Sequence, residues 1–73
     1  LISQGDIDEA LARYEFLIKK GKRLDEIIED LEDVSAQLPK NAEILQALGD
    51  AYMREDRLQE ALDTYSKVEA LLQ

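Results

Sequence analysis

The 73-residue chain is predicted to fold entirely as α-helices, packed as consecutive antiparallel hairpins. Apolar residues recur at steps of three and four along the whole chain, and no stretch alternates with a period of two. Capping residues, together with Gly21 and Pro39, divide this pattern into four segments of roughly 13 to 16 residues. The connections between segments are only a few residues long, so neighbouring helices must run antiparallel.

The first helix is expected to begin at a capping box, because Glu9 follows Asp6 at the required spacing. Lys19, Lys20 and Gly21 suit its end, since cations favour a helix C-terminus and Gly adopts the left-handed conformation there. The second helix ends before Pro39. The apolar positions of these two helices are Ile7, Ala10, Leu11, Tyr14, Leu17 and Ile18, then Leu24, Ile27, Ile28, Leu31, Val34 and Leu38.

The third and fourth helices have their own start signals. Asn41 is a good N-cap for the third helix. Asp56, followed by Gln59 at the capping-box spacing, is expected to cap the fourth. The apolar positions are Ile44, Leu45, Leu48, Ala51 and Tyr52 in the third helix, then Leu58, Ala61, Leu62, Tyr65, Val68 and Leu72 in the fourth.

The two halves of the chain repeat each other at an offset of 34 residues, at which eight pairs of apolar residues coincide. Leu11 falls on Leu45, for example, and Leu31 falls on Tyr65. The repeated unit is therefore a two-helix hairpin that occurs twice.

The second half resembles the tetratricopeptide repeat, whose period is 34 residues and whose pattern is W-x2-L-G-x2-Y, A-x3-F and P. Small residues in this pattern allow two helices to cross closely. The matching residues are Leu45, Leu48, Gly49 and Tyr52, then Ala61 and Tyr65, with Pro39 at the proline position of the first unit.

The resemblance implies one domain over residues 1–73, with units at 8–41 and 42–73 stacked as a right-handed α-solenoid. The first unit diverges, because Glu15 and Ile27 replace the two small residues of the pattern, so we expect a looser crossing there. An alternative is that residues 4–14 form the turn and second helix of a unit, with Leu1 and Ile2 ending an upstream helix. Either way, we expect a fragment of a longer repeat array.

The family's usual role is to bind a protein or peptide in a groove formed by the first helices of successive units. Phe16 lies nearly opposite the apolar stripe of its helix, so it is either an aromatic anchor for a partner or a contact with an upstream repeat. None of the positions of the family's carboxylate clamp holds Lys or Asn, so a receptor for chaperone tails is not expected. The implied groove residues are Ala12, Phe16, Lys19, Gln46, Asp50 and Met53.

Self-assembly is the alternative function. The apolar positions of the fourth helix, including Leu71, cover roughly half of its circumference, whereas a helix with one neighbour needs a stripe of about 100°. Copies of the chain would then stack through the exposed edges of the first and fourth helices.

Composition excludes most catalytic classes. The chain contains no Cys and no His, so it has no thiol nucleophile, histidine base or Ser-His-Asp triad, and no cysteine or histidine to ligate a metal. No carboxylate pair has a nucleophile or cation placed to assist it, so we expect no enzymatic activity, no metal and no cofactor. The acids along residues 25–33 are interpreted as a solvated face.

Charge and hydropathy restrict the partners. The formal net charge of −8 disfavours nucleic acid. Apolar runs do not exceed three residues, which excludes a membrane span and a signal peptide, and a cytoplasmic location is the default expectation. Residues 19–23 (KKGKR) could be a nuclear-import signal or an anion patch. The favoured interpretation is a helix C-terminus followed by a loop.

Overall fold

The computed structural model describes residues 4–73, apart from the side chains of Gln4 and Ile7. This part of the chain contains helices and no strand, which confirms the all-α prediction. The proposed role of Leu1 and Ile2 lies outside the described residues. The helices are α1 (Gln4–Lys20), α2 (Leu24–Gln37), α3 (Ala42–Arg54) and α4 (Leu58–Leu72).

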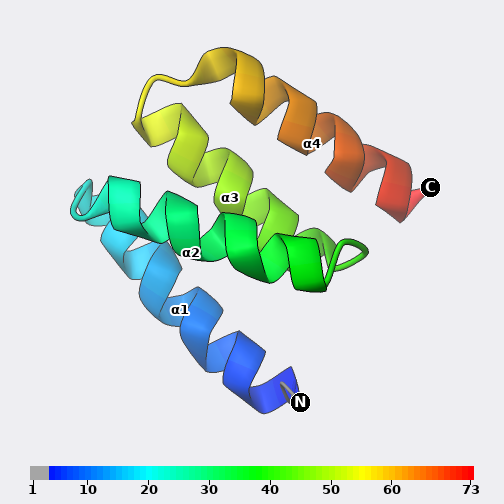
Figure 1. The fold of residues 1–73 in the computed structure, drawn as a ribbon, viewed down its shortest axis with the longest axis horizontal. Helices are drawn as coiled ribbons and strands as arrows, with labels where there is room; N and C mark the ends of the chain where they lie inside the picture. The colour runs from blue at the N-terminus through cyan, green and yellow to red at the C-terminus, as the bar shows by residue number, and fades with distance from the viewer. Residues whose placement is uncertain (1–3) are drawn as a thin grey trace.

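In Figure 1, α1 and α4 lie at opposite edges of the molecule, with α2 and α3 between them. Helix α3 packs most extensively against α4 and next against α2, and it also contacts α1. The contact between α1 and α2 is the smallest of the four, which agrees with the looser crossing expected in the first hairpin. Helix α3 is therefore the centre of the packing.

The core forms where α3 meets its neighbours. Ile28, Leu31 and Ile44 are the largest fully buried side chains. At the crossing of α3 and α4, a Cβ atom added to Gly49 would lie only 2.6 Å from Cε1 of Tyr65. Ala61 is fully buried on the α4 side. The small residues of the sequence pattern thus permit the close approach that was predicted for them.

Left-handed residues end α1 and α3. Gly21 has a φ of 70° and donates from its N–H to the carbonyl of Ile18 (3.0 Å), while Lys22 donates to the carbonyl of Leu17 (3.1 Å). These two bonds form a Schellman motif, so the predicted end of the first helix is confirmed. The same pair of bonds ends α3, where Asp56 (φ 64°) holds the position of Gly21.

The capping predictions have mixed outcomes. The Asn41 side chain accepts a hydrogen bond from the Ile44 N–H (3.2 Å), so that N-cap is confirmed. The prediction for Asp56 is wrong, since α4 begins after Arg57 and has no side-chain cap. Asp56 instead ends the preceding helix by adopting the left-handed conformation, which Asp tolerates better than most residues.

The predicted start of the first helix is also wrong. Asp6 lies inside α1, which already includes Gln4, so it cannot be the residue that precedes the helix. Its carboxylate is still in the first turn, where a negative charge favours the helix dipole. Residues 4–6 are helical, so the turn that the alternative placed there is absent, while the assignment of α1 as the first or second helix of a unit stays a prediction. Within residues 4–73, no helix has the length and apolar character needed to cross a bilayer.

Candidate partner-binding groove

A hollow of about 430 Å³ opens between the C-terminal halves of α1 and α3. It contains three of the six predicted groove residues, namely Lys19, Asp50 and Met53. The apolar side chain of Met53 is 46% exposed, which leaves it available to a ligand. The full lining consists of Glu15, Ile18, Lys19, Asp50, Met53, Arg54 and Tyr65.

A second hollow of about 340 Å³ lies beside the first, toward the N-terminus of α3. It contains Gln46, a fourth predicted groove residue, and it shares Glu15 and Asp50 with the first hollow. Its remaining lining residues are Glu43 and Ala47. The two hollows together form a groove along α1 and α3, with Glu43 at one end, Lys19 at the other, and Glu15 and Asp50 shared between them.

Ala12 and Phe16 are exposed on α1 and line neither hollow. Phe16 is 60% exposed, and its ring lies 5.6 Å (centroid) from the Nζ of Lys20. The core side of the same helix is formed by Leu11 and Ile18, which are both buried. Phe16 therefore has no part in the core, as its helical position predicted.

Arg54 closes the end of the first hollow, and sequence reasoning missed it. Its Nε donates to the carbonyl of Ile18 (3.0 Å) and its Nη2 to the carbonyl of Lys19 (3.0 Å). These carbonyls belong to the last turn of α1. The Ile18 carbonyl also accepts from the Gly21 N–H, so Arg54 supplies a further donor to it. Arg54 directly follows Met53, but its partners on α1 lie 36 and 35 residues away, so no local sequence signal identifies its role.

Tyr65 of α4 fixes the carboxylate in the middle of the groove and was also missed as a site residue. Its hydroxyl donates to Oδ1 of Asp50 (2.5 Å). Burial, with a smaller contribution from this hydrogen bond, raises the pKa of Tyr65 to about 12. The phenol thus remains a neutral donor at physiological pH and holds Asp50 as an acceptor.

A second tyrosine, Tyr52, joins α2, α3 and the start of α4. Tyr52 of α3 donates to Oε2 of Glu32 on α2 (2.5 Å), and the Arg57 guanidinium lies 4.8 Å from the Tyr52 ring centroid. Arg57 in turn pairs with Glu60 of α4 through two hydrogen bonds. Burial, followed by the bond to Glu32, raises the pKa of Tyr52. This cluster holds α2, α3 and the start of α4 in one arrangement.

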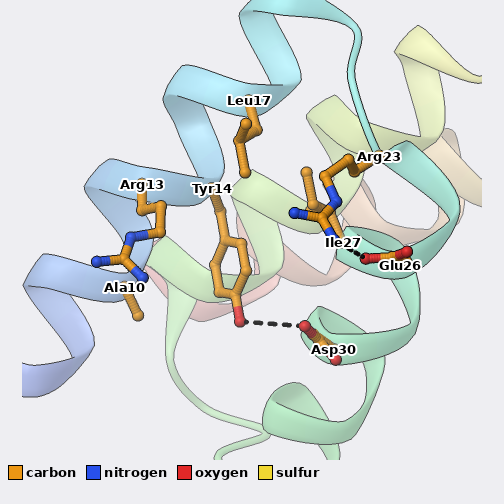
Figure 2. Close-up of a pocket in the computed structure, with 8 residues that line it drawn as sticks. All are labelled: Ala10, Arg13, Tyr14, Leu17, Arg23, Glu26, Ile27 and Asp30. Carbon is orange, nitrogen blue, oxygen red and sulfur yellow. Dashed lines mark hydrogen bonds and ion pairs between the residues drawn. The ribbon is translucent and has the colours of Figure 1, made fainter.

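Another hollow, of about 270 Å³, separates α1 from α2 (Figure 2). The Tyr14 side chain points across it and donates to Asp30 (3.4 Å), and Arg23 pairs with Glu26 (3.2 Å). Burial is the main cause that raises the pKa of Tyr14. The remaining lining residues are Ala10, Arg13, Leu17 and Ile27. Residues 4–73 hold no group of three or more His, Cys, Asp or Glu residues placed to hold a metal ion.

A family model described as tetratricopeptide repeat matches residues 1–73. The chain belongs to the tetratricopeptide repeat family. No curated protein and no solved structure matches it. Tetratricopeptide repeats generally mediate protein–protein interactions and are typically non-enzymatic.

In this tetratricopeptide repeat, residues of the family pattern form the helix crossing, and other side chains line the groove. Gly49 and Tyr65 occupy the close crossing that the family pattern implies. The groove residues Gln46 and Lys19 are exposed, whereas Asp50 is half-buried against Tyr65. The arrangement offers hydrogen-bonding groups and exposed apolar side chains, which are the chemical means to bind a polypeptide.

Proposed function

We propose that the chain is a non-enzymatic interaction module that binds a protein or peptide along α1 and α3. The observation that supports this most directly is the exposure of two large apolar side chains, Met53 in the groove and Phe16 on the same helix as Lys19. Neither helps to fill the core, and exposed apolar surface next to polar groups is typical of binding sites. The proposed contacts are Ala12, Phe16, Lys19, Gln46, Asp50 and Met53.

The proposed mechanism is docking onto a surface that is already formed. We take α1–α2 and α3–α4 as the two units, at residues 8–41 and 42–73, so that α1 and α3 are the two first helices. Hydrogen bonds from Arg54 to α1 and from Tyr65 to Asp50 hold the groove in one geometry. Binding to a preformed groove costs less conformational entropy than binding to a flexible one. Apolar contacts would supply affinity, and Lys19, Gln46 and Asp50 would select the ligand.

A peptide-display selection tests this proposal, because it requires no named partner. Short random peptides are selected on the immobilised chain, and the affinity of each enriched peptide is measured for the unchanged chain and for Phe16→Ala and Met53→Ala. We expect most enriched peptides to lose about tenfold or more in affinity on one of these changes, since anchoring side chains dominate binding.

The matched control is Glu29→Ala, an exposed residue on α2 outside the groove. It should leave the affinity of the same peptides unchanged. Enriched peptides that respond equally to Glu29→Ala and to the groove variants, or to none of them, would contradict the groove as the binding site.

Self-assembly is the second candidate, and exposed leucines on α4 favour it. Leu62 is 60% and Leu72 is 72% exposed. Ile28 holds the position of Leu62 in the first half of the chain, and it is only 2% exposed because it belongs to the core. Copies would stack with α1 of one chain against α4 of the next.

Sedimentation over a range of concentrations, without ligand, distinguishes the two candidates. Self-assembly requires the mass to grow with concentration, and Leu62→Glu should abolish that growth. Gln59→Glu on the same helix adds the same charge and should not. A chain that stays monomeric up to the highest soluble concentration would exclude this second candidate.

A further inference from the structure

Basic residues surround the exposed ring of Phe16. Arg13 precedes it by three residues, and Lys19 and Lys20 follow it by three and four, so all three project from the same side of α1. The Lys20 ammonium already lies 5.6 Å from the ring centroid. We call Arg13, Phe16, Lys19 and Lys20 the basic–aromatic surface.

Positive charge is concentrated at this end of α1, although the chain as a whole carries a net charge of −8. Five of the nine Lys and Arg residues fall within residues 13–23. Within residues 4–73, the ion pairs join Arg23 to Glu26 and Arg57 to Glu60, so neither Lys19 nor Lys20 is paired with an acid. Their charge is therefore available to a ligand.

The groove continues this surface onto α3. Lys19 lines the same hollow as Met53, and its carbonyl accepts a hydrogen bond from Arg54. The acids of the groove are placed differently. Asp50 and Glu15 line both hollows, Asp50 is engaged by Tyr65, and Glu43 lines only the hollow nearer the N-terminus of α3. Lys19 and Met53 line only the hollow at the C-terminal ends of α1 and α3, so a ligand there can contact a cation and an apolar side chain together.

The basic–aromatic surface is particular to α1 rather than a property of the repeat. At the offset of 34 residues, Ala47 replaces Arg13 and Asp50 replaces Phe16 on α3. Met53 replaces Lys19, and Arg54, which replaces Lys20, is turned to the backbone of α1. The combination of an exposed aromatic ring with unpaired lysines therefore needs an explanation of its own.

We infer that the ligand is an acidic polypeptide segment that places an apolar side chain on Phe16 and carboxylates on Lys19 and Lys20. This inference rests on the proposed binding function and names the class of partner. Unpaired lysines attract carboxylates, and the Phe16 ring supplies the apolar contact that ion pairs on an exposed surface lack. We infer a short protein segment rather than a nucleic acid, because the net charge of −8 repels an extended polyanion more strongly than a segment with a few carboxylates.

The peptide selection described above also tests this inference. The enriched peptides should carry a net negative charge and an aromatic or aliphatic residue. This outcome is distinctive, because the negative net charge of the chain would otherwise favour basic peptides. Their affinity should fall as salt is raised, since screening weakens contacts between exposed charges. The double variant Lys19→Glu/Lys20→Glu should bind them about tenfold or more weakly.

Two further variants separate a specific effect of Lys19 and Lys20 from a general effect of charge or of misfolding. Lys40→Glu/Lys67→Glu makes the same change of charge at two exposed positions away from α1 and should retain most of the affinity. Lys19→Gln/Lys20→Gln removes the two positive charges without placing acids at the end of a helix, so the variant should fold normally. Its peptide affinity should lie between those of the unchanged chain and of Lys19→Glu/Lys20→Glu. Circular dichroism on each variant checks that the helices are intact.

Other outcomes would overturn the inference in distinguishable ways. Peptides that depend on Phe16 or Met53 but are basic or neutral would refute the acidic ligand and leave the proposed function standing. An absence of any groove-dependent peptide would refute both. Equal or tighter binding of a short single-stranded DNA, lost in Lys19→Glu/Lys20→Glu, would point to nucleic acid instead. Self-association lost in that double variant would point to the acidic α2 face of a second copy.

Discussion

The Arg54 guanidinium of α3 donates from its Nε to the carbonyl oxygen of Ile18 in the last turn of α1. A second bond, from Nη2 to the carbonyl of Lys19, completes a two-pronged contact with residues that lie 36 and 35 positions before Arg54 in sequence. The direct packing of α1 on α2 is slight, so this contact has an important part in holding α1 beside the groove. The position of Lys19, and with it the basic end of the groove, therefore depends on Arg54.

Arg54→Ala is expected to destabilise the chain by about 1–2 kcal/mol, because two carbonyls of α1 lose charged donors. Hydrogen exchange in the last turn of α1 should become faster, while α4 should be little affected. Arg54→Lys should recover only part of the loss, since an ammonium cannot reproduce the planar fork. Lys67→Ala is the control for removing an exposed cation. Unchanged stability and unchanged exchange in Arg54→Ala would contradict this role.

Gly49→Ala is expected to destabilise the chain by about 1–3 kcal/mol, as in other overpacked cores. The new methyl group would lie 2.6 Å from the Tyr65 ring, which must move and weaken its bond to Asp50. An ordinary helical Gly→Ala change has the opposite sign, with a gain of about 0.5–1 kcal/mol. Urea denaturation measures the stability change of Gly49→Ala and, for comparison, that of Gly5→Ala at an exposed position in α1.

The cause of this loss can be tested in a Tyr65→Ala background. Removal of the ring opens space for the methyl group, so Gly49→Ala should then cost little or become stabilising. Equal costs in the two backgrounds would show that the Tyr65 ring is not the obstacle.

The fold was predictable from the sequence because periodicity and the spacing of small residues are local signals. Gly49 is an example, since its place in the pattern already indicated a close helix crossing. Asp56 shows where such signals fail. The same side chain can cap the start of one helix or end the previous one in the left-handed conformation, and only the packing of α3 on α4 decides between them.

The candidate groove was predictable only in part. The exposed positions of α1 and α3, such as Phe16, follow from helical geometry. Arg54 and Tyr65 could not be assigned in this way, because their partners lie 36 and 15 residues away in sequence. The packing of the helices determines which distant groups these side chains can reach. Their contribution to the groove could therefore be seen only in the structure.

Phe16→Ala is expected to change the free energy of unfolding by less than about 0.5 kcal/mol, as is usual for exposed positions. Its side chain is 60% exposed and contributes nothing to the core. Leu31→Ala, which empties a fully buried position between α2 and its neighbours, should cost about 2–5 kcal/mol. Thermal melts of both variants make the comparison, and a loss for Phe16→Ala approaching that of Leu31→Ala would assign Phe16 to the core.

Stability is expected to fall as the pH rises through the alkaline range, and Tyr65 contributes to this fall. Burial raises the pKa of Tyr65 from 10.0 to about 12 in the folded chain. Above pH 10 the unfolded chain therefore loses this proton while the folded chain keeps it. The folded state then binds more protons, so stability decreases with pH across that window. The raised pKa values of Tyr14 and Tyr52 act in the same direction.

Tyr65→Phe isolates this contribution. At neutral pH the variant should be less stable by about 0.5–1.5 kcal/mol, because Asp50 loses a hydrogen-bond donor. Its stability should decline less steeply than that of the unchanged chain between about pH 9 and about pH 11.5, since one titrating phenol is gone. Urea denaturation at each pH gives both curves, and lysine titration cancels in their difference. Parallel curves would mean that the Tyr65 phenol titrates alike in the folded and unfolded chain.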